Sequence, residues 1–354
     1  MLELYKKGVS GMNKKSPLVS ILIVNFNGGE VLDSCLTSLK KTTYPNFETI
    51  VVDNGSTDKS VAIVRKKHKW VKLVEAKKNL GFASGNNLAY RFAKGEYIAL
   101  LNGDTEVEPG WLEKLVNFAR KHKDGAAFAT KVLFYDDKKT LNSAGGLCDW
   151  YGFSPLRGTF EKDEGQYNDP GLVFYAHGAA MMVRAEAIER VGFLDDDFFI
   201  YHEELDFCWR LWIAGYKVYY VPEAVAYHKL KQRNFYAPEK RTQRQFLVKK
   251  NRISTLIKNH KSLSLLLVSI LVNLAISLGE TVIYLFRGDL QTIKGTFLAY
   301  EWNAKNFKGD WEKRKKVQKL YKADEDYILK RMKKFPVAIE IFKGIISGKF
   351  SLPL

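Results

Sequence analysis

Residues 19–60 read VSILIVNFNGGEVLDSCLTSLKKTTYPNFETIVVDNGSTDKS, and this stretch predicts the first part of a parallel sheet. The run from Val19 to Val24 is apolar and rich in β-branched residues, and residues 48–53 repeat that pattern. Between them, residues 30–40 have the periodicity of an amphipathic helix. A strand, a helix and a second strand in this order are typical of a βαβ unit in a sheet covered on both faces.

The same alternation continues along the chain, interrupted by an irregular segment at residues 136–170. The further expected elements are helices at 58–65, 84–93, 110–121 and 203–214, and strands at 71–75, 97–101, 174–183, 217–221 and 224–228. We therefore expect an α/β fold with a mixed, mostly parallel sheet and helices on both faces. Ligands in such sheets bind beyond the carboxyl ends of the strands.

Size and composition fit a globular protein of one large domain or two small ones, because the 354 residues are 46% hydrophobic. The three cysteines, Cys35, Cys148 and Cys208, have no paired spacing. This argues against a disulfide framework or a cysteine zinc site and indicates a reducing compartment. No signal peptide is predicted, because the apolar run after Pro17 is short and ends at Asn25.

The net charge of +17 lies entirely in the C-terminal third. Residues 1–228 hold 29 Lys and Arg against 29 Asp and Glu, whereas residues 229–354 hold 27 against 10. The difference of 27 and 10 accounts for the whole +17. A basic region beside a neutral one suggests contact with an anionic surface, either acidic lipid or nucleic acid.

The most apolar segment, residues 263–286, has about the length that a membrane-spanning helix needs, ~20 residues. Its polar residues fall within about 80° of helical arc; they are Ser262, Ser269, Asn273, Ser277 and Glu280. Such a stripe favours a helix at a membrane interface, or packed against the protein, over a lone span. A buried core helix is the alternative.

Three predicted strands end in polar residues: Asn25-Phe26-Asn27, Asp53-Asn54-Gly55-Ser56 and Asn102-Gly103-Asp104. Neither GxxxxGK[ST] nor GxGxxG follows the first strand, and no Ser lies in GxSxG. P-loop, dinucleotide-binding and esterase interpretations therefore lack their main support. Acids at strand ends suit a divalent cation and a nucleotide.

Each of these acids has a structural alternative. Asp53 can accept hydrogen bonds from an imide N–H or a hydroxyl, whereas Asp58 is better explained as a helix cap. Asp104 can bind Mg²⁺ or Mn²⁺, which take one or two carboxylates together with substrate phosphates. His228, at the end of a strand, is a candidate nitrogen ligand, although a lone histidine there is more often structural.

A second group of acids, Glu203, Glu204 and Asp206, begins a predicted helix after the apolar segment 198–201. A salt-bridge ladder with Arg210 is the structural explanation. A carboxylate beside aromatic residues can instead have its pKa raised toward that of a general base. We favour a role for this group of acids as a general base over a salt-bridge ladder.

Taken together, these segments resemble the family 2 glycosyltransferases of GT-A fold, and among them rhamnosyltransferase-like members. The resemblance covers about residues 17–255. It rests on residues 19–60, on NLGFASGNNLAY at 79–90, on LLNGDTEVEPGWLEKLV at 100–116 in the place of the DxD motif, and on HGAAMMVRAEAIERVGFLDDDFFIYHEELDFCWR at 177–210.

The resemblance implies a role for each matched position. Asp53 would contact a pyrimidine base, and Asn25, Asn27, Asn79, Gly81, Asn102, Gly103 and Asp104 would line the nucleotide-sugar pocket. Asp104 and His228 would bind Mg²⁺ or Mn²⁺, and His177, Gly178 and Trp209 would lie on the acceptor side. The base would be Glu204 or Glu203, with Asp206 positioning the helix or the acceptor. Many relatives have Glu-Asp where this chain has Glu-Glu.

The resemblance also implies an inverting, metal-dependent transfer from a dTDP- or UDP-sugar, with rhamnose as the suggested sugar. The acceptor would be a hydroxyl of a glycan or a polyprenyl-linked glycan used in cell surface polysaccharide biosynthesis. We expect a flexible segment 1–16, a catalytic domain 17–235 (halves 17–105 and 106–235) and a basic helical region 236–354 with a membrane-associating segment 262–287. Residues 229–354 would hold the enzyme peripherally at the cytoplasmic face of the membrane, without nucleic acid.

Two other classes remain open. A sugar-nucleotide nucleotidyltransferase also needs acidic metal sites, but the loop NFNGGE at 25–30 has no Lys or Arg to hold a triphosphate. A non-catalytic protein that binds an anionic surface, either membrane or nucleic acid, is permitted by the basic C-terminal region.

Overall fold

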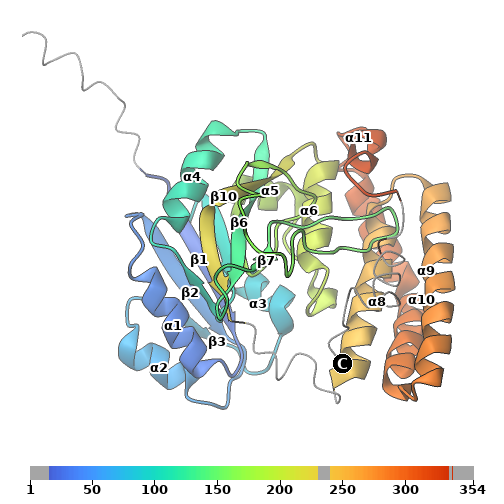
Figure 1. Cartoon of the computed structure of the whole chain (residues 1–354), viewed down its shortest axis with the longest axis horizontal. Helices are drawn as coiled ribbons and strands as arrows, with labels where there is room; N and C mark the ends of the chain where they lie inside the picture. The colour runs from blue at the N-terminus through green and yellow to red at the C-terminus, as the bar shows by residue number, and fades with distance from the viewer. Residues whose placement is uncertain (1–15, 230–239, 335–336, 338–354) are drawn as a thin grey trace, which may run out of the picture.

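The computed structural model describes residues 16–229, 240–334 and 337, and within them a ten-stranded mixed sheet forms the centre of the molecule (Figure 1). The strands are β1 (Val19–Asn25), β2 (Phe47–Asp53), β3 (Lys72–Glu75), β4 (Tyr97–Leu101), β5 (Thr105–Val107), β6 (Gly125–Phe134), β7 (Leu141–Ser143), β8 (Gly171–Leu172), β9 (Ala180–Arg184) and β10 (Lys217–His228). The helices are α1 (Gly29–Leu39), α2 (Ser60–Lys67), α3 (Gly81–Tyr90), α4 (Trp111–Lys121), α5 (Ala185–Val191), α6 (Glu203–Ile213), α8 (Arg241–Asn259), α9 (Leu263–Phe286), α10 (Leu290–Gln318) and α11 (Glu325–Leu329), with a 3₁₀ turn η1 (Asp196–Phe198).

The strands are ordered β3-β2-β1-β4-β9-β6-β10-β5. β1 is parallel to β2 and β4, and β2 is parallel to β3, so the N-terminal part of the sheet is entirely parallel. β9 runs antiparallel to β4 and β6, whereas β10 is parallel to β6. The predicted α/β fold with a mixed sheet is confirmed, and parallel pairing predominates in the N-terminal part alone.

Helices cover both faces of the sheet because successive strand residues point to opposite sides. Ile21 and Ile23 pack with the side chains of α1 and α4, while Leu22 packs in a second core that includes α6. This two-sided burial explains why β1 and β4 are apolar at nearly every position.

Three predicted boundaries were wrong, and one of them is that of α3, which covers Gly81–Tyr90 and not 84–93. The strand expected at 174–183 begins only at Ala180, because the preceding residues form a turn around His177 and Gly178. The two strands expected at 217–221 and 224–228 are one, β10, whose pairing with β6 shifts register between Val221 and Val225. Pro222, which has no N–H to donate, lies at that irregularity.

The C-terminal helices form a bundle beside the sheet domain, with α9 outermost (Figure 1). The polar stripe of α9 faces the protein: Ser269 Oγ donates to the Trp150 carbonyl and Asn273 Nδ2 to the Tyr151 carbonyl, each at 2.9 Å. Only 22% of the most apolar 18-residue stretch of α9 is buried, so the alternative prediction of a buried core helix is wrong. Among the described residues α9 is long and apolar enough to cross a membrane, with a mean hydropathy of 2.1.

Candidate active site

The edge where β1 and β2 end holds a hydrogen-bonded pair, Asn25 and Asp53, which are partners in the strand register. Asn25 Nδ2 donates to one oxygen of Asp53 at 2.9 Å, and the backbone N–H of Ser56 donates to the other at 2.9 Å. Both side chains are buried. The contacts fix the orientation of the carboxylate, and its remaining lone pairs are available to a ligand.

Asn27 and Phe26 form the rim of this edge. Asn27 has a left-handed backbone (φ 52°), and its side-chain oxygen accepts from the Thr57 N–H at 2.8 Å. This bond joins the β1 turn to the β2 turn. Phe26 is 50% exposed between the two asparagines, and an exposed ring suits stacking against a planar base. Sequence reasoning missed it, although a lone aromatic between polar strand-end residues was the available signal.

Asn79 and Gly81 shape the adjoining turn before α3. The Gly81 N–H donates to the Asn79 side-chain oxygen at 2.9 Å, and Asn54 Nδ2 donates to the Gly81 carbonyl at 2.9 Å. Gly81 has φ +78°, and a Cβ there would lie 2.5 Å from the ring of Phe199. The position therefore requires glycine on both conformational and steric grounds.

The turn Asn102-Gly103-Asp104 after β4 lies next to the same edge. The Asn102 N–H donates to the Ala179 carbonyl at 2.9 Å, and its carbonyl accepts from the Thr105 N–H at 3.0 Å. A Cβ on Gly103 would lie 3.9 Å from the side-chain oxygen of Asn25. The turn thus passes close to Asn25 at Gly103, the residue before Asp104.

Asp104 meets His228 at the end of β10, with Oδ1 and Nε2 3.1 Å apart. The other ring nitrogen of His228, Nδ1, lies 3.1 Å from the side-chain oxygen of Asn142. If Nδ1 donates its proton to Asn142, Nε2 faces the carboxylate as a second acceptor. A proton on Nε2, or a cation between the two groups, satisfies this arrangement.

His177 and Gly178 connect this pair to the acids of α6. The His177 ring centre lies 6.1 Å from that of His228, and burial together with His228 lowers the pKa of His177 to about 3. His177 is therefore neutral at physiological pH. A Cβ on Gly178 would lie 3.2 Å from Phe82 and 3.7 Å from Glu204 Oε1, which leaves no free space between them.

Glu203 and Glu204 begin α6 in surroundings that disfavour charge. Burial, together with the charge of Glu204, raises the pKa of Glu203 well above its ordinary value, and burial raises the pKa of Glu204. Among the described residues, Oε2 of each has no hydrogen-bond partner. Glu203 is buried, whereas Glu204 is partly accessible and lies beside Gly178. Glu204 is thus the acid that a hydroxyl can reach.

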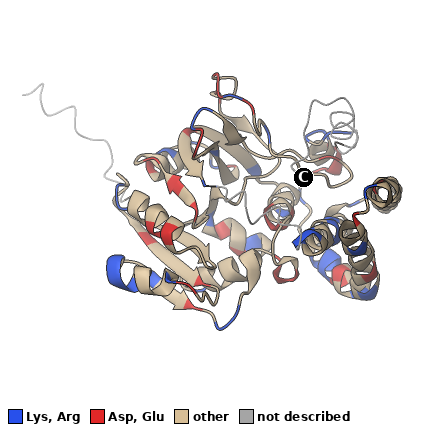
Figure 2. Ribbon diagram, turned by 60° about the horizontal axis from the view of Figure 1, so that its bottom comes forward, with Lys and Arg blue, Asp and Glu red and all other residues tan. Residues whose placement is uncertain are grey.

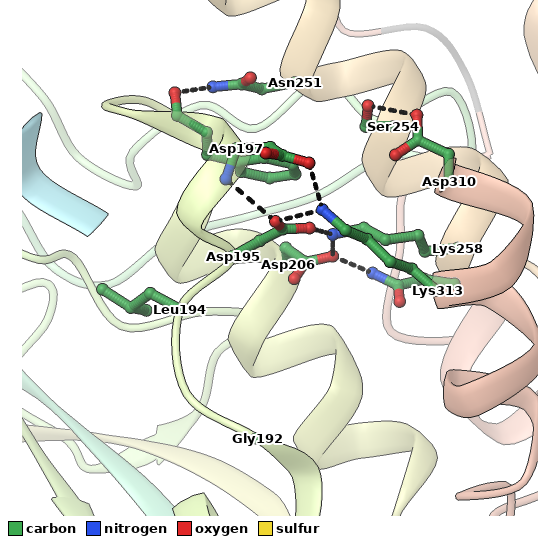
Figure 3. Close-up of polar contacts among 12 residues, drawn as sticks. Gly192, Leu194, Asp195, Asp197, Asp206, Asn251, Ser254, Lys258, Asp310 and Lys313 are labelled. Atoms are coloured by element: carbon green, nitrogen blue, oxygen red, sulfur yellow. Dashed lines mark hydrogen bonds and ion pairs between the residues drawn. The ribbon is translucent and has the colours of Figure 1, made fainter. Parts of the chain in front are cut away.

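Asp206 points the other way, into an ion-pair network with the C-terminal helices (Figure 3). Its oxygens bind Arg210 Nε at 3.0 Å, Lys258 Nζ at 2.9 Å and Asn259 Nδ2 at 3.0 Å. These contacts agree with the expected role of Asp206 in positioning the helix, and they correct only its grouping with Glu203 and Glu204 as a catalytic acid, because both of its oxygens are bonded. Trp209 is also corrected, because it is 1% exposed and packs against Phe174 and His260 in the core.

Residues 20–192 match the family model described as glycosyl transferase family 2. The chain belongs to glycosyl transferase family 2. An uncharacterized glycosyltransferase of Haemophilus influenzae is 27% identical over 221 residues, which cover 60% of this chain and 66% of that protein. The chain thus spans a little less than two thirds of that relative.

Solved structures share the fold of this family 2 glycosyltransferase. A mannosyltransferase from Pyrobaculum calidifontis, in complex with GDP-mannose and Mn²⁺, superposes with a TM-score of 0.53 at 16% identity, covering 96% of this chain and 82% of that one. GalNAc-T7 with UDP, GalNAc and Mn²⁺ gives a TM-score of 0.54 at 17% identity, covering 69% and 48%. At these identities the likeness shows the GT-A fold.

The donor set of the glycosyltransferase fits a divalent cation held jointly with substrate. Across the described residues, no three His, Cys, Asp or Glu side chains converge on one point. Asp104 and His228 offer one oxygen and one nitrogen, and hard cations such as Mg²⁺ complete their shell with substrate phosphates and water. The distance of 3.1 Å between Asp104 Oδ1 and His228 Nε2 is the observation that supports such an ion.

Proposed function

We propose that this chain is an inverting glycosyltransferase that moves a sugar from a nucleotide-diphosphate sugar to a hydroxyl group. One observation carries the proposal: Glu204, a partly accessible carboxylate with a raised pKa, lies beside Gly178, and the ring of the adjacent His177 neighbours the His228–Asp104 pair, whose turn passes close to Asn25 at Gly103. A base and a nucleotide-binding edge at the same end of one sheet suit a displacement between two bound substrates.

In this reaction the Glu204 carboxylate accepts the proton of the acceptor hydroxyl. The oxygen then attacks the anomeric carbon in line, and the bond from that carbon to the diphosphate oxygen breaks with its electron pair. The single displacement inverts the anomeric configuration. Asp53 and Asn25 bind and orient the nucleoside, and neutral His177 borders the reaction centre.

We propose Asp104 and His228 as the protein ligands of Mg²⁺ or Mn²⁺. When bound with the diphosphate, such an ion supplies neutralisation of the charge that develops on the leaving group. The GDP-mannose, UDP and Mn²⁺ bound to the two structural neighbours support a donor and cation of this class. Rhamnose as the sugar remains a proposal from the sequence resemblance.

The test is a donor panel of dTDP-rhamnose, UDP-N-acetylglucosamine and GDP-mannose with Mg²⁺ or Mn²⁺, comparing wild type with Glu204→Gln. Glu204→Gln should lose transfer by about 10²–10⁴-fold, the usual contribution of a general base. Donor affinity by calorimetry should stay within about twofold. Full activity of Glu204→Gln would remove Glu204 as the base, and no release of nucleotide from any donor would overturn the function.

We also propose that the acceptor is a glycan, free or polyprenyl-linked, used in cell surface polysaccharide biosynthesis at the cytoplasmic membrane face, where α9 attaches the enzyme peripherally. The outer face of α9 carries Leu267, Leu271 and Leu278, which are 58%, 55% and 69% exposed. Apolar patches of this kind on soluble proteins mark interaction surfaces. Exposed basic residues Lys261 and Arg287 flank α9, which itself has no Lys or Arg. Figure 2 shows further Lys and Arg, in blue, on the neighbouring C-terminal helices. That charge pattern favours an anionic lipid surface.

Attachment along the surface is favoured over a crossing helix because α9 is bonded to the protein by its polar stripe. Lys249 Nζ binds Glu280 at 2.5 Å and Ser277 at 2.6 Å, and these contacts would break if α9 left the protein to span a bilayer. Association of two copies through the same face would bring Lys261 and Arg287 of both chains together, which like charges oppose.

Flotation with vesicles containing phosphatidylglycerol tests the attachment. Leu271→Glu with Leu278→Glu should weaken binding about 100-fold, taking ~1.5 kcal/mol for each leucine removed from hydrocarbon. The matched control is Leu172→Glu, an exposed leucine on β8, and it should bind as wild type. Retention after an alkaline carbonate wash would indicate a spanning helix instead, and dimerisation without vesicle binding would indicate a second copy.

A further inference from the structure

The segment Asp195–His202, which joins α5 to α6, has an unusual backbone. Three of its residues that are not glycine have positive φ: Phe199 (63°), Tyr201 (77°) and His202 (67°). Phe199 has ψ −64°, and the Ile200 N–H donates to the Phe198 carbonyl at 2.7 Å, which closes a tight turn around it. L-residues rarely adopt these conformations unless the surroundings enforce them.

This segment sets the position of two parts of the active site. The Phe199 carbonyl accepts from the N–H groups of Phe82 (2.6 Å) and Ala83 (3.1 Å), which fixes the start of α3. At its other end His202 precedes the first turn of α6 and accepts from the Asp206 N–H at 2.9 Å. The same backbone therefore places Phe82, which lies against Gly178, and Glu204.

A single side chain of α8 holds the turn in this shape. Asn251, which is fully buried, donates from Nδ2 to the carbonyls of Phe198 (2.9 Å), Ile200 (3.0 Å) and Tyr201 (2.7 Å). Figure 3 shows Asn251 reaching this backbone from α8. Three carbonyls that converge on one point repel one another unless a donor lies between them, so the amide is what makes the convergence favourable.

Ion pairs surround this contact but act on the side chains next to the turn. Lys258 Nζ binds Asp195 at 2.6 Å, and Lys313 Nζ binds Asp195 at 2.5 Å and Asp197 at 2.6 Å (Figure 3). These contacts attach α8 and α10 to the start of the segment. Asn251, by contrast, donates directly to the backbone of the turn, at the carbonyls of Phe198, Ile200 and Tyr201.

We propose that Asn251 is a positioning residue for the reaction: it holds the turn at 198–201 so that α6 presents Glu204 beside Gly178 and α3 presents Phe82 opposite. The inference rests on the proposed function, since it assigns Asn251 a task in placing that base. Asn251 touches neither the nucleotide edge nor Asp104, so its loss should affect turnover and not donor binding.

The test compares Asn251→Leu, which keeps the size and removes the donor, with Asn303→Leu. Asn303 is a matched control because it is also a buried asparagine of the helical bundle: its Nδ2 bonds the Ala299 carbonyl within α10, and its side-chain oxygen accepts from Ser254 of α8, not from the turn before α6. Asn251→Leu should lower kcat 10- to 100-fold with donor KM within twofold, whereas Asn303→Leu should keep kcat within twofold. Asn251→Ser, which retains a hydroxyl donor, should recover part of kcat and serves if Asn251→Leu does not fold.

Hydrogen exchange gives a readout that needs no substrate. In Asn251→Leu the amides of Phe82 and Ala83 should exchange at least tenfold faster than in wild type, and in Asn303→Leu they should not. Unchanged exchange at these two amides, or unchanged kcat, would overturn the positioning role. Should Glu204→Gln retain full activity while Asn251→Leu still speeds exchange, the base assignment fails and the structural part of the inference stands.

Discussion

Replacing Lys258 with methionine should destabilise the protein through a buried charge imbalance. Lys258 Nζ lies 2.6 Å from Asp195 and 2.9 Å from Asp206, and the three side chains are 3%, 9% and 0% exposed. Methionine keeps most of the stem and removes the ammonium group. Two buried carboxylates would then share fewer cations, because Arg210 would remain on Asp206 and Lys313 on Asp195.

The expected loss of stability follows from the cations that remain beside the two carboxylates. Removing one partner of a buried pair costs about 3–5 kcal/mol, and the remaining cations place this case at the lower end, about 3 kcal/mol. With an unfolding entropy of about 2.1 cal/mol/K per residue, the 354 residues give about 0.7 kcal/mol per degree. The melting temperature should therefore fall by about 4 °C, measured by calorimetry at pH 7.

The pH dependence gives the sign of the effect. Burial alone would raise the pKa of Asp206, but Lys258 and Arg210 overcome it, so the folded-state pKa lies below the ordinary value. A depressed carboxyl pKa contributes stability that is present above the unfolded-state pKa, about 3.9, and lost as the pH falls below it. The difference in melting temperature between wild type and Lys258→Met should therefore shrink between pH 5 and pH 2, taken as roughly the range of carboxyl titration.

A matched control is Lys315→Met, which removes a lysine from an exposed pair with Glu312 at 2.7 Å. Exposed pairs contribute about 0–1 kcal/mol, so its melting temperature should change by less than about 1 °C. Equal losses in Lys258→Met and Lys315→Met, or a difference that widens toward acid, would refute the reasoning.

Three further outcomes are expected. Burial raises the pKa of Glu204, and only the ionised carboxylate can act as the base. In a kcat–pH profile, turnover should therefore fall at a pH above the ordinary glutamate pKa of about 4.3. An inflection at or below that pH would contradict the assignment of Glu204. Asp104→Ala should abolish the metal dependence of donor binding in calorimetry, and an unchanged dependence would exclude Asp104 as a ligand. Gly81→Ala should lower the free energy of unfolding by about 1–3 kcal/mol, because Gly81 has φ +78° and Phe199 would lie 2.5 Å from the added carbon. Gly171→Ala should lower it by less than about 1 kcal/mol, because the added carbon has open space around it.

The parallel N-terminal part of the sheet could be predicted from the sequence because its signal is local, whereas β6 (Gly125–Phe134) was missed. β4 begins and ends where the apolar run does, at Tyr97 and Leu101, and the polar residues after β1, β2 and β4 meet at one edge because parallel strands share their direction. The turn at His177 could not be predicted, since the apolar residues before it are buried in loops and not in β9. Hydrophobicity reports burial and does not distinguish strand from buried loop.

The roles of the α6 acids depended on contacts that no local pattern contains. Asp206 and Lys258 are 52 residues apart in the printed sequence, yet their charges lie 2.9 Å apart. Helical spacing predicted the Asp206–Arg210 pair, which the structure has, but could not indicate that α8 covers that face. Trp209 follows the same logic, because only the packing of His260 on it shows that its face of α6 points away from the acceptor side.

Four successive residues of α8, Lys249 to Arg252, bond two neighbours, because each is turned about 100° from the last and the fourth returns near the face of the first. Lys249 and Arg252 bond Glu280 and Asn273 of α9, while Lys250 and Asn251 bond backbone carbonyls of the segment before α6. The match to the family model ends at residue 192, before all of them. A chimera or truncation drawn at that limit would also discard Glu204 and His228, whereas one drawn at the end of β10 would keep both and discard the contacts of α8 that support the base. Exchanging acceptor preference between relatives by recombination should therefore require α6, α8 and α10 to be inherited together.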